Sequence, residues 1–459
     1  MKGTKTTNID TMLKIIHWMG VIFFMCYNIS QTEVKRLLYT MDKIINLFKK
    51  DHVKGHISNT FWLNFTQVIS GIAVFLFSYF VAKYIDKNTY GTYKYLLSTL
   101  SVFGAFGLSG IGVAITRTVA RGYKNALYYG SIIYLKFSII SFGISSCAGL
   151  YYLVKGNGLF GWFFIIGGLI YPFMTISQFY NYYLLGKKDF KQYSFYALIP
   201  DIVPPIILTI CIFAFQNIYS LLIAYIASTL ICNGIFFIKT IKVTGTGRDE
   251  NFEKEMSHQA KHLSLNNLMS GIVGQIDKFL VFQFIGPAQL ASYTFSIAIP
   301  DFIKPFVKNI NTVFFPTMTQ SNSKSHLKKI MLVTIGSSIL LALLIVFSYA
   351  ISANFIFKTL FPNYIEAVYP SIIYSVTILL IGLQNPITTL FQAKAKNSLL
   401  HKNTSITSVF QLLILFIGIY LNPTILGMIY SRILGQLASS IITITQAKKA
   451  YDQSLIHSK

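Results

Sequence analysis

Long apolar stretches alternate with short polar links along the chain from about residue 58 onward. A helix that spans a membrane needs about 20 consecutive, mostly apolar residues. Windows of that length occur twelve times, at residues 58–82, 95–115, 127–153, 159–184, 193–215, 218–238, 262–285, 291–318, 330–352, 367–390, 404–421 and 424–446. The pattern therefore predicts an all-α polytopic membrane protein with about twelve transmembrane helices.

Basic residues collect in alternate links, and this alternation orients the predicted helices. The basic links hold Arg117, Arg121 and Lys124; Lys187, Lys188 and Lys191; Lys239, Lys242, Arg248, Lys254 and Lys261; Lys324, Lys328 and Lys329; and Lys394, Lys396 and Lys402. The intervening links hold Lys83, Lys87, Lys94, Lys155 and Lys358. Positive residues favour the cytoplasmic side of a membrane. Both termini are therefore expected in the cytoplasm, with the helices in the plasma membrane.

Composition changes this picture little. Hydrophobic residues make up 53% of the 459 residues and charged residues 12%, against about 25% charged residues in soluble domains. The net charge of +24 would suit a nucleic-acid binder if it were concentrated on a soluble domain, and the pattern predicts no such domain. The basic links explain the excess, and no nucleic-acid partner is expected.

Motifs for catalysis or metal binding are missing from the sequence. The cysteines lie in apolar stretches without metal-ligand spacing, and they are Cys26, Cys147, Cys211 and Cys232. There is no GxxxxGK[ST] loop for a nucleotide. The links that face outward are too short for the acidic or histidine clusters expected of a membrane polymerase or transferase. The sequence therefore argues against an enzyme and against a metal site.

The two halves of the chain resemble each other. Residues 63–93 align without a gap with residues 263–293, including Ser70/Ser270, Gly71/Gly271 and Ile72/Ile272. Six helices return the chain to its starting side, so the repeat is parallel, and in such transporters the substrate lies between halves that rock around it. The predicted division is a cytoplasmic segment 1–56, an N-terminal six-helix bundle 57–240, a cytoplasmic linker 241–260, a C-terminal six-helix bundle 261–447 and a cytoplasmic tail 448–459.

The N-terminal segment contains a shorter apolar run at residues 13–30, interrupted by Lys14 and His17. It is too short for a confident span, and an interfacial helix or a signal-anchor-like segment fits it better. Met41 begins a second plausible cytoplasmic start, which leaves open whether residues 1–40 belong to the working protein.

Eight ionisable residues fall well inside the predicted spans, and they are Lys136, Asp201, Asp277, Lys278, Asp301, Lys304, Lys308 and Arg432. A charge at the centre of a membrane helix costs about 2.5–3.5 kcal/mol on insertion scales, so these side chains should line a cavity or form pairs. The i, i+3, i+7 spacing of Asp301, Lys304 and Lys308 places all three on one helical face.

A proline motif accompanies two of the carboxylates. Residues 200–205 read PDIVPP and residues 300–305 read PDFIKP. Proline interrupts the helical hydrogen-bond ladder, which membrane proteins tolerate where the freed carbonyls meet protein or water. Pro200, Pro205, Pro300 and Pro305 are therefore predicted hinges beside inward carboxylates.

If all eight charges face one cavity, five are positive and three negative, a net of +2. Such a cavity favours an anion, and lysine binds phosphate as a point charge. The basic members are therefore candidates for a lipid-linked diphosphate. Asp201, Asp277 and Asp301 are candidates for charge balance or for coupling to H⁺ or Na⁺; no other cofactor is expected. The alternatives are Asp–Lys pairs that only stabilise packing, and snorkelling of Lys136 and Arg432 toward the interface.

Residues 59–121 resemble the polysaccharide flippase family, the O-antigen exporters of the multidrug/oligosaccharidyl-lipid/polysaccharide exporter superfamily. The likeness lies in the Tyr90-Gly91-Thr92-Tyr93 opening of the second span, the run FGAFGLSGIG, and Arg117, which closes that span. Residues 274–296, with Asp277 and Lys278 followed by a glycine-containing turn and a tyrosine, are similar to the seventh span of that family.

The resemblance implies two six-helix bundles around a cationic cavity. It also implies a substrate, an undecaprenyl-diphosphate-linked oligosaccharide such as an O-antigen or capsule repeat unit, moved by alternating access across the bacterial inner membrane. Arg117, Asp277 and Lys278 carry over by position. Membrane lipids, a polysaccharide polymerase and chain-length proteins are the expected partners. The alternatives are a multidrug or cation antiporter of the same superfamily, a peptidoglycan-precursor flippase, and a membrane-embedded polymerase or transferase.

Overall fold

The computed structural model describes residues 51–244, 250–321, 324–394 and 397–456, and within those ranges every regular element is a helix. The elements are α3 (Asp51–Tyr84), α4 (Lys87–Ala105), α5 (Ile111–Ala120), α6 (Ala126–Val154), α7 (Gly158–Ser177), α8 (Phe179–Gly186), α9 (Phe190–Ala214), α10 (Ile218–Thr244), α11 (Glu250–Phe284), α12 (Pro287–Gln320), α13 (Lys324–Leu360), the 3₁₀-helix η1 (Pro362–Ala367), α14 (Val368–Ala393), α15 (Asn397–Leu421) and α16 (Ile425–Ile456). The predicted all-α fold class is confirmed.

The chain divides into two compact units, Met1–Phe65 and Thr66–Lys459, and the second unit holds every site residue considered below. The apolar run 13–30 and the choice of start residue lie outside the described residues. Whether the second unit works as two six-helix bundles, with the predicted boundaries at 57–240 and 261–447, stays a prediction.

Every one of the twelve predicted spans coincides with a helix, but two of them are broken. The second is divided into α4 and α5, where the glycine-rich residues 106–110 leave the helical path, and the fourth is divided into α7 and α8 at Gln178. Within the described ranges, nine helices are long and apolar enough to cross a membrane. The helices α4, α11 and α12 are not among these nine. The exact number of crossings stays a prediction.

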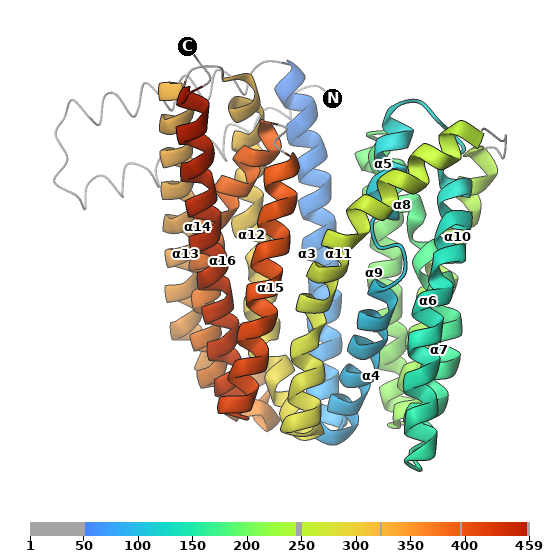
Figure 1. Cartoon of the computed structure of the whole chain (residues 1–459). Coiled ribbons are helices and arrows are strands. Elements are labelled where there is room, and N and C mark those ends of the chain that lie inside the picture. The colour runs from blue at the N-terminus through green and yellow to red at the C-terminus, as the bar shows by residue number, and fades with distance from the viewer. Residues whose placement is uncertain (1–50, 245–249, 322–323, 395–396, 457–459) are drawn as a thin grey trace, which may run out of the picture. The chain divides into compact units, whose positions relative to one another are not determined.

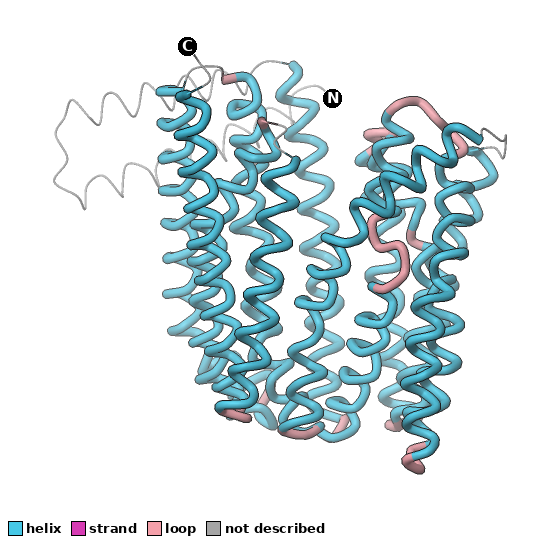
Figure 2. The backbone as a smooth tube through the Cα atoms, viewed as in Figure 1, coloured by secondary structure: helices cyan, strands magenta, loops and turns pink. Residues whose placement is uncertain are grey.

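The helices of the second unit form two groups (Figure 1). Helices α4 to α10, the first helix group, lie together on the right of the view, and helices α12 to α16, the second helix group, lie together on the left. Figure 2 shows that most of the links are short and lie at the two ends of the helices. The links 85–86, 285–286 and 422–424 share the end that we call the lower end.

Helix α11 runs obliquely between the groups and packs on both (Figure 1). Near its start, Met256 and Ala260 are buried in one apolar cluster with Ile111 and Tyr180 of the first group. These turns of α11 lie in the predicted linker 241–260, much of which is therefore helical. Farther along, α11 packs against α15 of the second group.

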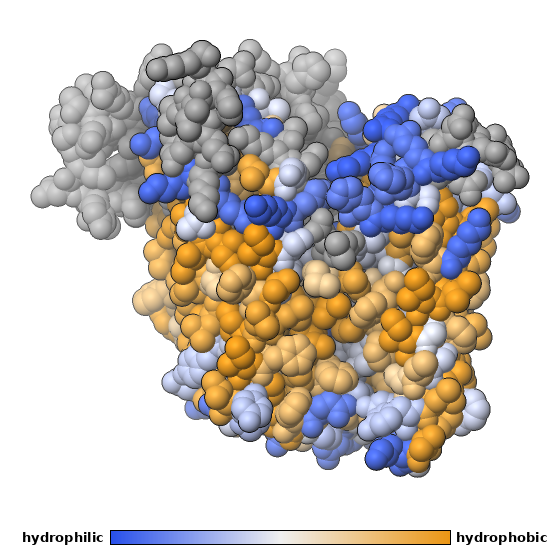
Figure 3. Space-filling view, viewed as in Figure 1, coloured by the Kyte–Doolittle hydropathy of each residue, from blue (hydrophilic) through white to orange (hydrophobic). Residues whose placement is uncertain are grey.

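Exposed apolar side chains form a broad band around the middle of the face shown in Figure 3, between two more polar zones. Ile139, Phe347, Ile351 and Phe355 are each more than two-thirds exposed. Water would penalise such a surface, whereas hydrocarbon chains solvate it. The protein is therefore a multi-pass membrane protein; its placement in the inner membrane and the cytoplasmic position of its termini stay predictions.

The two helix groups meet closely at the lower end, where α4 approaches α12. A Cβ atom added at Gly91 would lie 1.8 Å from the backbone oxygen of Pro287, so only glycine fits there. Lys87 forms an ion pair with Glu366, and Ser292 donates to the same carboxylate at 2.8 Å. We call this region the α4–α12 contact; it joins the two helix groups at the lower end.

Candidate functional site

Asp277 of α11 is the most deeply buried of the predicted site residues, with no exposed surface. Arg432 Nη2 donates to its Oδ2 at 2.7 Å, and the Tyr293 hydroxyl donates to the same oxygen at 2.6 Å. A buried carboxylate requires this kind of pairing, because burial removes its hydration and only hydrogen-bonded or charged partners replace it. The Asp277 triad (Asp277, Arg432 and Tyr293) therefore ties α11, α16 and α12 together.

A second triad of the same type lies in α12 and α14. Lys304 Nζ lies 2.5 Å from Asp301 Oδ1 and donates to the Tyr374 hydroxyl at 2.8 Å. The Tyr374 hydroxyl in turn donates to Asp301 at 3.0 Å, and its ring lies under the ammonium at 4.1 Å. The side chain of Asp301 is 43% exposed and that of Lys304 only 13%. The Asp301 triad (Asp301, Lys304 and Tyr374) is thus open on its acidic side.

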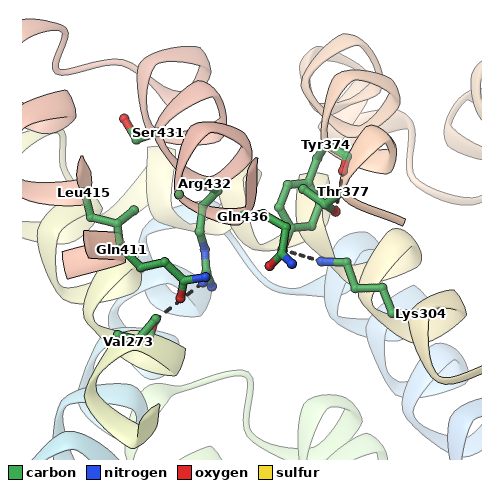
Figure 4. Close-up of a pocket in the computed structure, with 10 residues that line it drawn as sticks. Val273, Lys304, Tyr374, Thr377, Gln411, Leu415, Ser431, Arg432 and Gln436 are labelled. Carbon is green, nitrogen blue, oxygen red and sulfur yellow. Dashed lines mark hydrogen bonds between the residues drawn. The ribbon is translucent and has the colours of Figure 1, made fainter. Parts of the chain in front are cut away.

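Arg432 and Lys304 line one small cavity inside the second helix group and next to α11 (Figure 4). Its other lining residues are Val273, Tyr374, Thr377, Gln411, Leu415, Ser431, Gly435 and Gln436. The cavity measures about 70 Å³, whereas pockets for organic ligands measure about 300–1,000 Å³. It has room for about two water molecules. Arg432 and Lys304 therefore line a space that is too small for a diphosphate headgroup.

Lys278 differs from Arg432 and Lys304, because the carboxylate next to it, that of Asp277, already accepts hydrogen bonds from Arg432 and Tyr293. Its ammonium lies 3.8 Å from Asp277 Oδ1, beyond hydrogen-bond distance, and it donates to Gln275 at 2.9 Å. The side chain is 16% exposed. One negative charge at Asp277 therefore serves both Arg432 and Lys278, which leaves a net charge of +1 in this cluster.

The other predicted site residues lie apart from both triads. Lys308 is exposed and forms part of neither triad. Asp201 of α9 accepts a hydrogen bond from Ser70 at 2.9 Å, while Lys136 on α6 and Arg117 on α5 are exposed. The eight predicted charges therefore do not meet in one cavity in this arrangement, and the roles assigned to them stay predictions.

The predicted hinge prolines lie inside two continuous helices. Pro200 and Pro205 fall within α9, and Pro300 and Pro305 fall within α12. The Thr209 hydroxyl donates a hydrogen bond to the carbonyl of Pro205 at 2.8 Å. The hinge role of all four residues stays a prediction.

Lys94 is a charged membrane residue that the sequence pattern placed in a link. It lies in the second turn of α4, with its ammonium 5.3 Å from the centre of the Tyr90 ring and 6.0 Å from that of Tyr93. The signal that could have revealed it is the N-cap Asp86, which accepts from Thr89 N at 2.9 Å and starts the helix at Lys87. Although burial acts to raise it, the hydrogen bonds from Thr89 hold the pKa of Asp86 below its usual value.

A polar contact between α11 and the first helix group was also not predicted from the sequence. Gln283 Nε2 donates to the hydroxyls of Tyr95 and Tyr152, both at 2.8 Å, and these hydroxyls lie 2.6 Å apart. The Tyr95 ring stacks on Phe282 with 3.9 Å between centroids. With 29 tyrosines in the chain, no sequence signal distinguishes Tyr95 and Tyr152 from the rest.

A second cavity is larger than the one beside Arg432 and Lys304, and it is apolar. It measures about 800 Å³ and lies between α7 and α10, lined by side chains such as Leu159, Trp162, Ile166, Leu222 and Ile226. It suits hydrocarbon chains and offers no charged group to a polar ligand, so it is not a candidate for headgroup binding.

The two lysines on one face of α12 should respond differently to truncation. Lys304→Ala is expected to lower the free energy of unfolding by about 1–2 kcal/mol, because Asp301 loses its charged donor. Lys308→Ala should change it by less than about 0.5 kcal/mol, as at other exposed positions. Thermal unfolding of the detergent-purified variants measures both, and equal losses would contradict the distinction.

Comparison with known proteins identifies the family. A family model described as polysaccharide biosynthesis protein matches residues 57–322, more than half of the chain. The chain belongs to this polysaccharide biosynthesis family. No curated protein matches the sequence significantly. The resemblance stated from residues 59–121 and 274–296 is therefore confirmed at the level of the family.

Solved structures share the fold of this family member. An inward-facing multidrug resistance MATE family transporter of the MOP superfamily aligns with a TM-score of 0.62 and 13% identity, over 86% of this chain and 96% of the other. The outward-facing form gives 0.58 and 14%, over 90% and 99%. The lipid II flippase MurJ, in an inward closed conformation, gives 0.60 and 13%, over 87% and 91%. At such identity the likeness shows the fold alone, which is that of transporters and flippases rather than enzymes.

Proposed function

We propose that this protein is a flippase that moves an oligosaccharide linked to undecaprenyl diphosphate across the bacterial inner membrane by alternating access. The family match supports a role in polysaccharide biosynthesis, and the fold supports transport. O-antigen or capsule repeat units are the glycans we expect. The protein carries this substrate and does not modify it.

The observation that carries the proposal is the uncompensated positive charge of Lys278. It lies on α11, the helix that packs on both helix groups, and Asp277 is already engaged by Arg432 and Tyr293. A partly exposed cation in a membrane-spanning region attracts an anionic group, and a diphosphate supplies one. A cationic drug would be repelled, which disfavours the multidrug antiporter as the alternative.

Coupling and partners follow as further parts of the proposal. Asp301 is the coupling carboxylate we favour for H⁺ or Na⁺, because its side chain is the more exposed of the two in the triads. Asp277 and Asp201 stay alternatives. A polysaccharide polymerase and chain-length proteins are the partners expected to receive the flipped substrate.

Lys278→Gln is expected to reduce export of the lipid-linked oligosaccharide at least about tenfold, the effect of losing one charge-assisted contact to the headgroup. The measurement is accumulation of this lipid on the cytoplasmic leaflet of cells, with the membrane level of the protein checked alongside. Lys278→Arg should retain most export, because it keeps the charge.

Lys155→Gln provides the matched control, since Lys155 is an exposed lysine in the link between α6 and α7. Normal export in Lys278→Gln cells would remove Lys278 from substrate binding. Normal glycan export in cells that lack the whole protein would overturn the proposed function.

A further inference from the structure

The small cavity inside the second helix group is lined by two cations. Arg432 of α16 and Lys304 of α12 both border it, and the rest of its wall comes from α11, α14, α15 and α16 (Figure 4). The other polar groups on the wall are the amides of Gln411 and Gln436 and the hydroxyls of Tyr374, Thr377 and Ser431. None of the described residues that line the cavity carries a carboxylate. The wall is therefore positive where it is charged.

The charges of the two triads and Lys278 do not cancel. The carboxylates of Asp277 and Asp301 supply two negative charges. Lys278, Lys304 and Arg432 supply three positive charges, so the cluster carries a net charge of +1. Such an excess is costly in a membrane-spanning region, where the dielectric constant is low. One monovalent anion would make the cluster neutral, whereas a divalent anion would reverse its sign.

Both cations on the cavity wall have a donor to spare. The Nε of Arg432 is buried and has no hydrogen-bond partner within the described parts of the chain. An ammonium group has three N–H bonds, and Lys304 uses two of them, on Asp301 and on the hydroxyl of Tyr374. Arg432 and Lys304 can therefore each donate one further hydrogen bond to an anion.

Two side-chain amides on the wall add neutral donors. Gln436 donates one N–H to Gln384 at 2.6 Å, and Gln411 donates one N–H to Ser439 at 3.3 Å. An amide group has two N–H bonds, so each keeps a second one. Two charged and two neutral donors are thus available around one small space, and an anion needs such a set of donors whereas a metal cation needs acceptors.

We infer that this cavity is a binding site for one monatomic anion, chloride under physiological conditions, held by Arg432, Lys304 and the amides of Gln411 and Gln436. The volume of about 70 Å³ has room for about two water molecules, which is sufficient for a halide ion. The inference goes beyond the proposed function and does not depend on it, because the site lies inside one helix group and is too small for the substrate.

The anion would stabilise the packing of the second helix group. Arg432 lies on α16, Lys304 on α12 and Gln411 on α15. One anion that attracts all three would join these helices and would reduce the repulsion between the two cations. The folded protein should therefore be more stable in chloride than in a salt whose anion cannot enter the cavity.

The test measures thermal unfolding of the purified full-length protein in detergent, in mixtures of sodium chloride and sodium gluconate at constant ionic strength. Tm should rise by about 2 °C for each tenfold increase in chloride above the half-filling concentration, because only the folded state has the site. Bromide should act as chloride does. Gluconate is too large for the cavity, and an equal rise in gluconate alone would overturn the inference in favour of a general salt effect.

Three variants connect the rise in Tm with the cavity. Lys304→Gln removes one cation and should abolish the chloride-dependent rise, although it unfolds at a lower temperature in every salt. Gln411→Leu removes a neutral donor and keeps all charges, so it should reduce the rise and serves as the test if Lys304→Gln does not fold. Lys358→Gln is the matched control, since Lys358 is an exposed lysine in the last turn of α13, and it should keep the full rise. A full rise in Lys304→Gln or in Gln411→Leu would overturn the assignment to this cavity.

A crystal structure of the protein grown in bromide locates the ion directly, because bromide scatters X-rays anomalously. The expected result is an anomalous peak within hydrogen-bond distance of Arg432 Nε and Lys304 Nζ. A cavity that contains water and gives no anomalous peak would show that solvent alone fills it, and the inference would be wrong.

Discussion

Asp277→Ala is expected to lower the free energy of unfolding by about 3–5 kcal/mol, the usual cost of removing one partner from a buried ion pair. The substitution leaves Arg432 and Lys278 without a carboxylate and removes the acceptor of the Tyr293 hydroxyl. Loss on this scale would deplete the folded protein in the membrane. Thermal unfolding of the purified variant and its level in membranes are the two measurements.

Two comparisons show whether charge pairing is the cause. Asp301→Ala should cost less, because the side chain of Asp301 is 43% exposed and water can replace part of what is lost. Adding Arg432→Leu to Asp277→Ala should recover much of the stability, since the stranded cation is then gone. A double variant as unstable as Asp277→Ala alone would contradict a role based on the Arg432 charge.

Gly91→Ala is expected to force the helix groups apart at the lower end. The new Cβ would lie 1.8 Å from the Pro287 backbone oxygen, and no side-chain rotation can relieve a clash with a main-chain atom. The α4–α12 contact must then open, and the Lys87–Glu366 ion pair separates with it. The ratio of open to closed molecules at this end should increase between about fivefold and about 150-fold for a cost of about 1–3 kcal/mol.

A cysteine at Ser292 reports this opening, since that side chain is only 2% exposed in the α4–α12 contact. The link between Lys83 and Lys87 is predicted to face away from the cytoplasm, so the reagent is added on that side. In a chain with its four native cysteines replaced, a membrane-impermeant maleimide should label Ser292→Cys about tenfold faster with Gly91→Ala present. Gly143→Ala is the matched control, because a Cβ there meets no atom within 4 Å. Equal labelling rates in the two variants would mean that the contact absorbs the methyl group without opening.

The positions of the helices were predictable from the sequence because a membrane forces regularity on the backbone. Backbone groups in hydrocarbon must bond within their own segment, so a long apolar stretch can only be a helix. Local exceptions were not predictable. The break between α4 and α5 depends on close approaches such as that of Gly110 to Ala260, where a Cβ would lie 2.6 Å from the backbone oxygen. No periodicity in the sequence encodes such a neighbour.

The residues of the candidate site were more predictable from the sequence than their arrangement in space. The cost of charge in a membrane singled out Asp277, Lys278 and Arg432 correctly as residues that need partners, and they cluster. Their pairing depends on contacts between helices far apart in sequence. Helical spacing put Lys304 and Lys308 on one face, yet only Lys304 reaches Tyr374, because one face of a helix spans several directions.

The anchoring of helix α11 in both helix groups has a mechanical consequence. Met256 and Ala260 are anchored in the core of the first helix group, while Asp277 is anchored through Arg432 to the second. Any rotation of one group against the other must therefore bend α11 between these anchors. Gly271 and Gly274 lie in that stretch, and glycine is where helices bend most readily. We expect α11 to resist this bending elastically. Its stiffness, set at these two glycines, should limit the rate of each cycle of opening and closing.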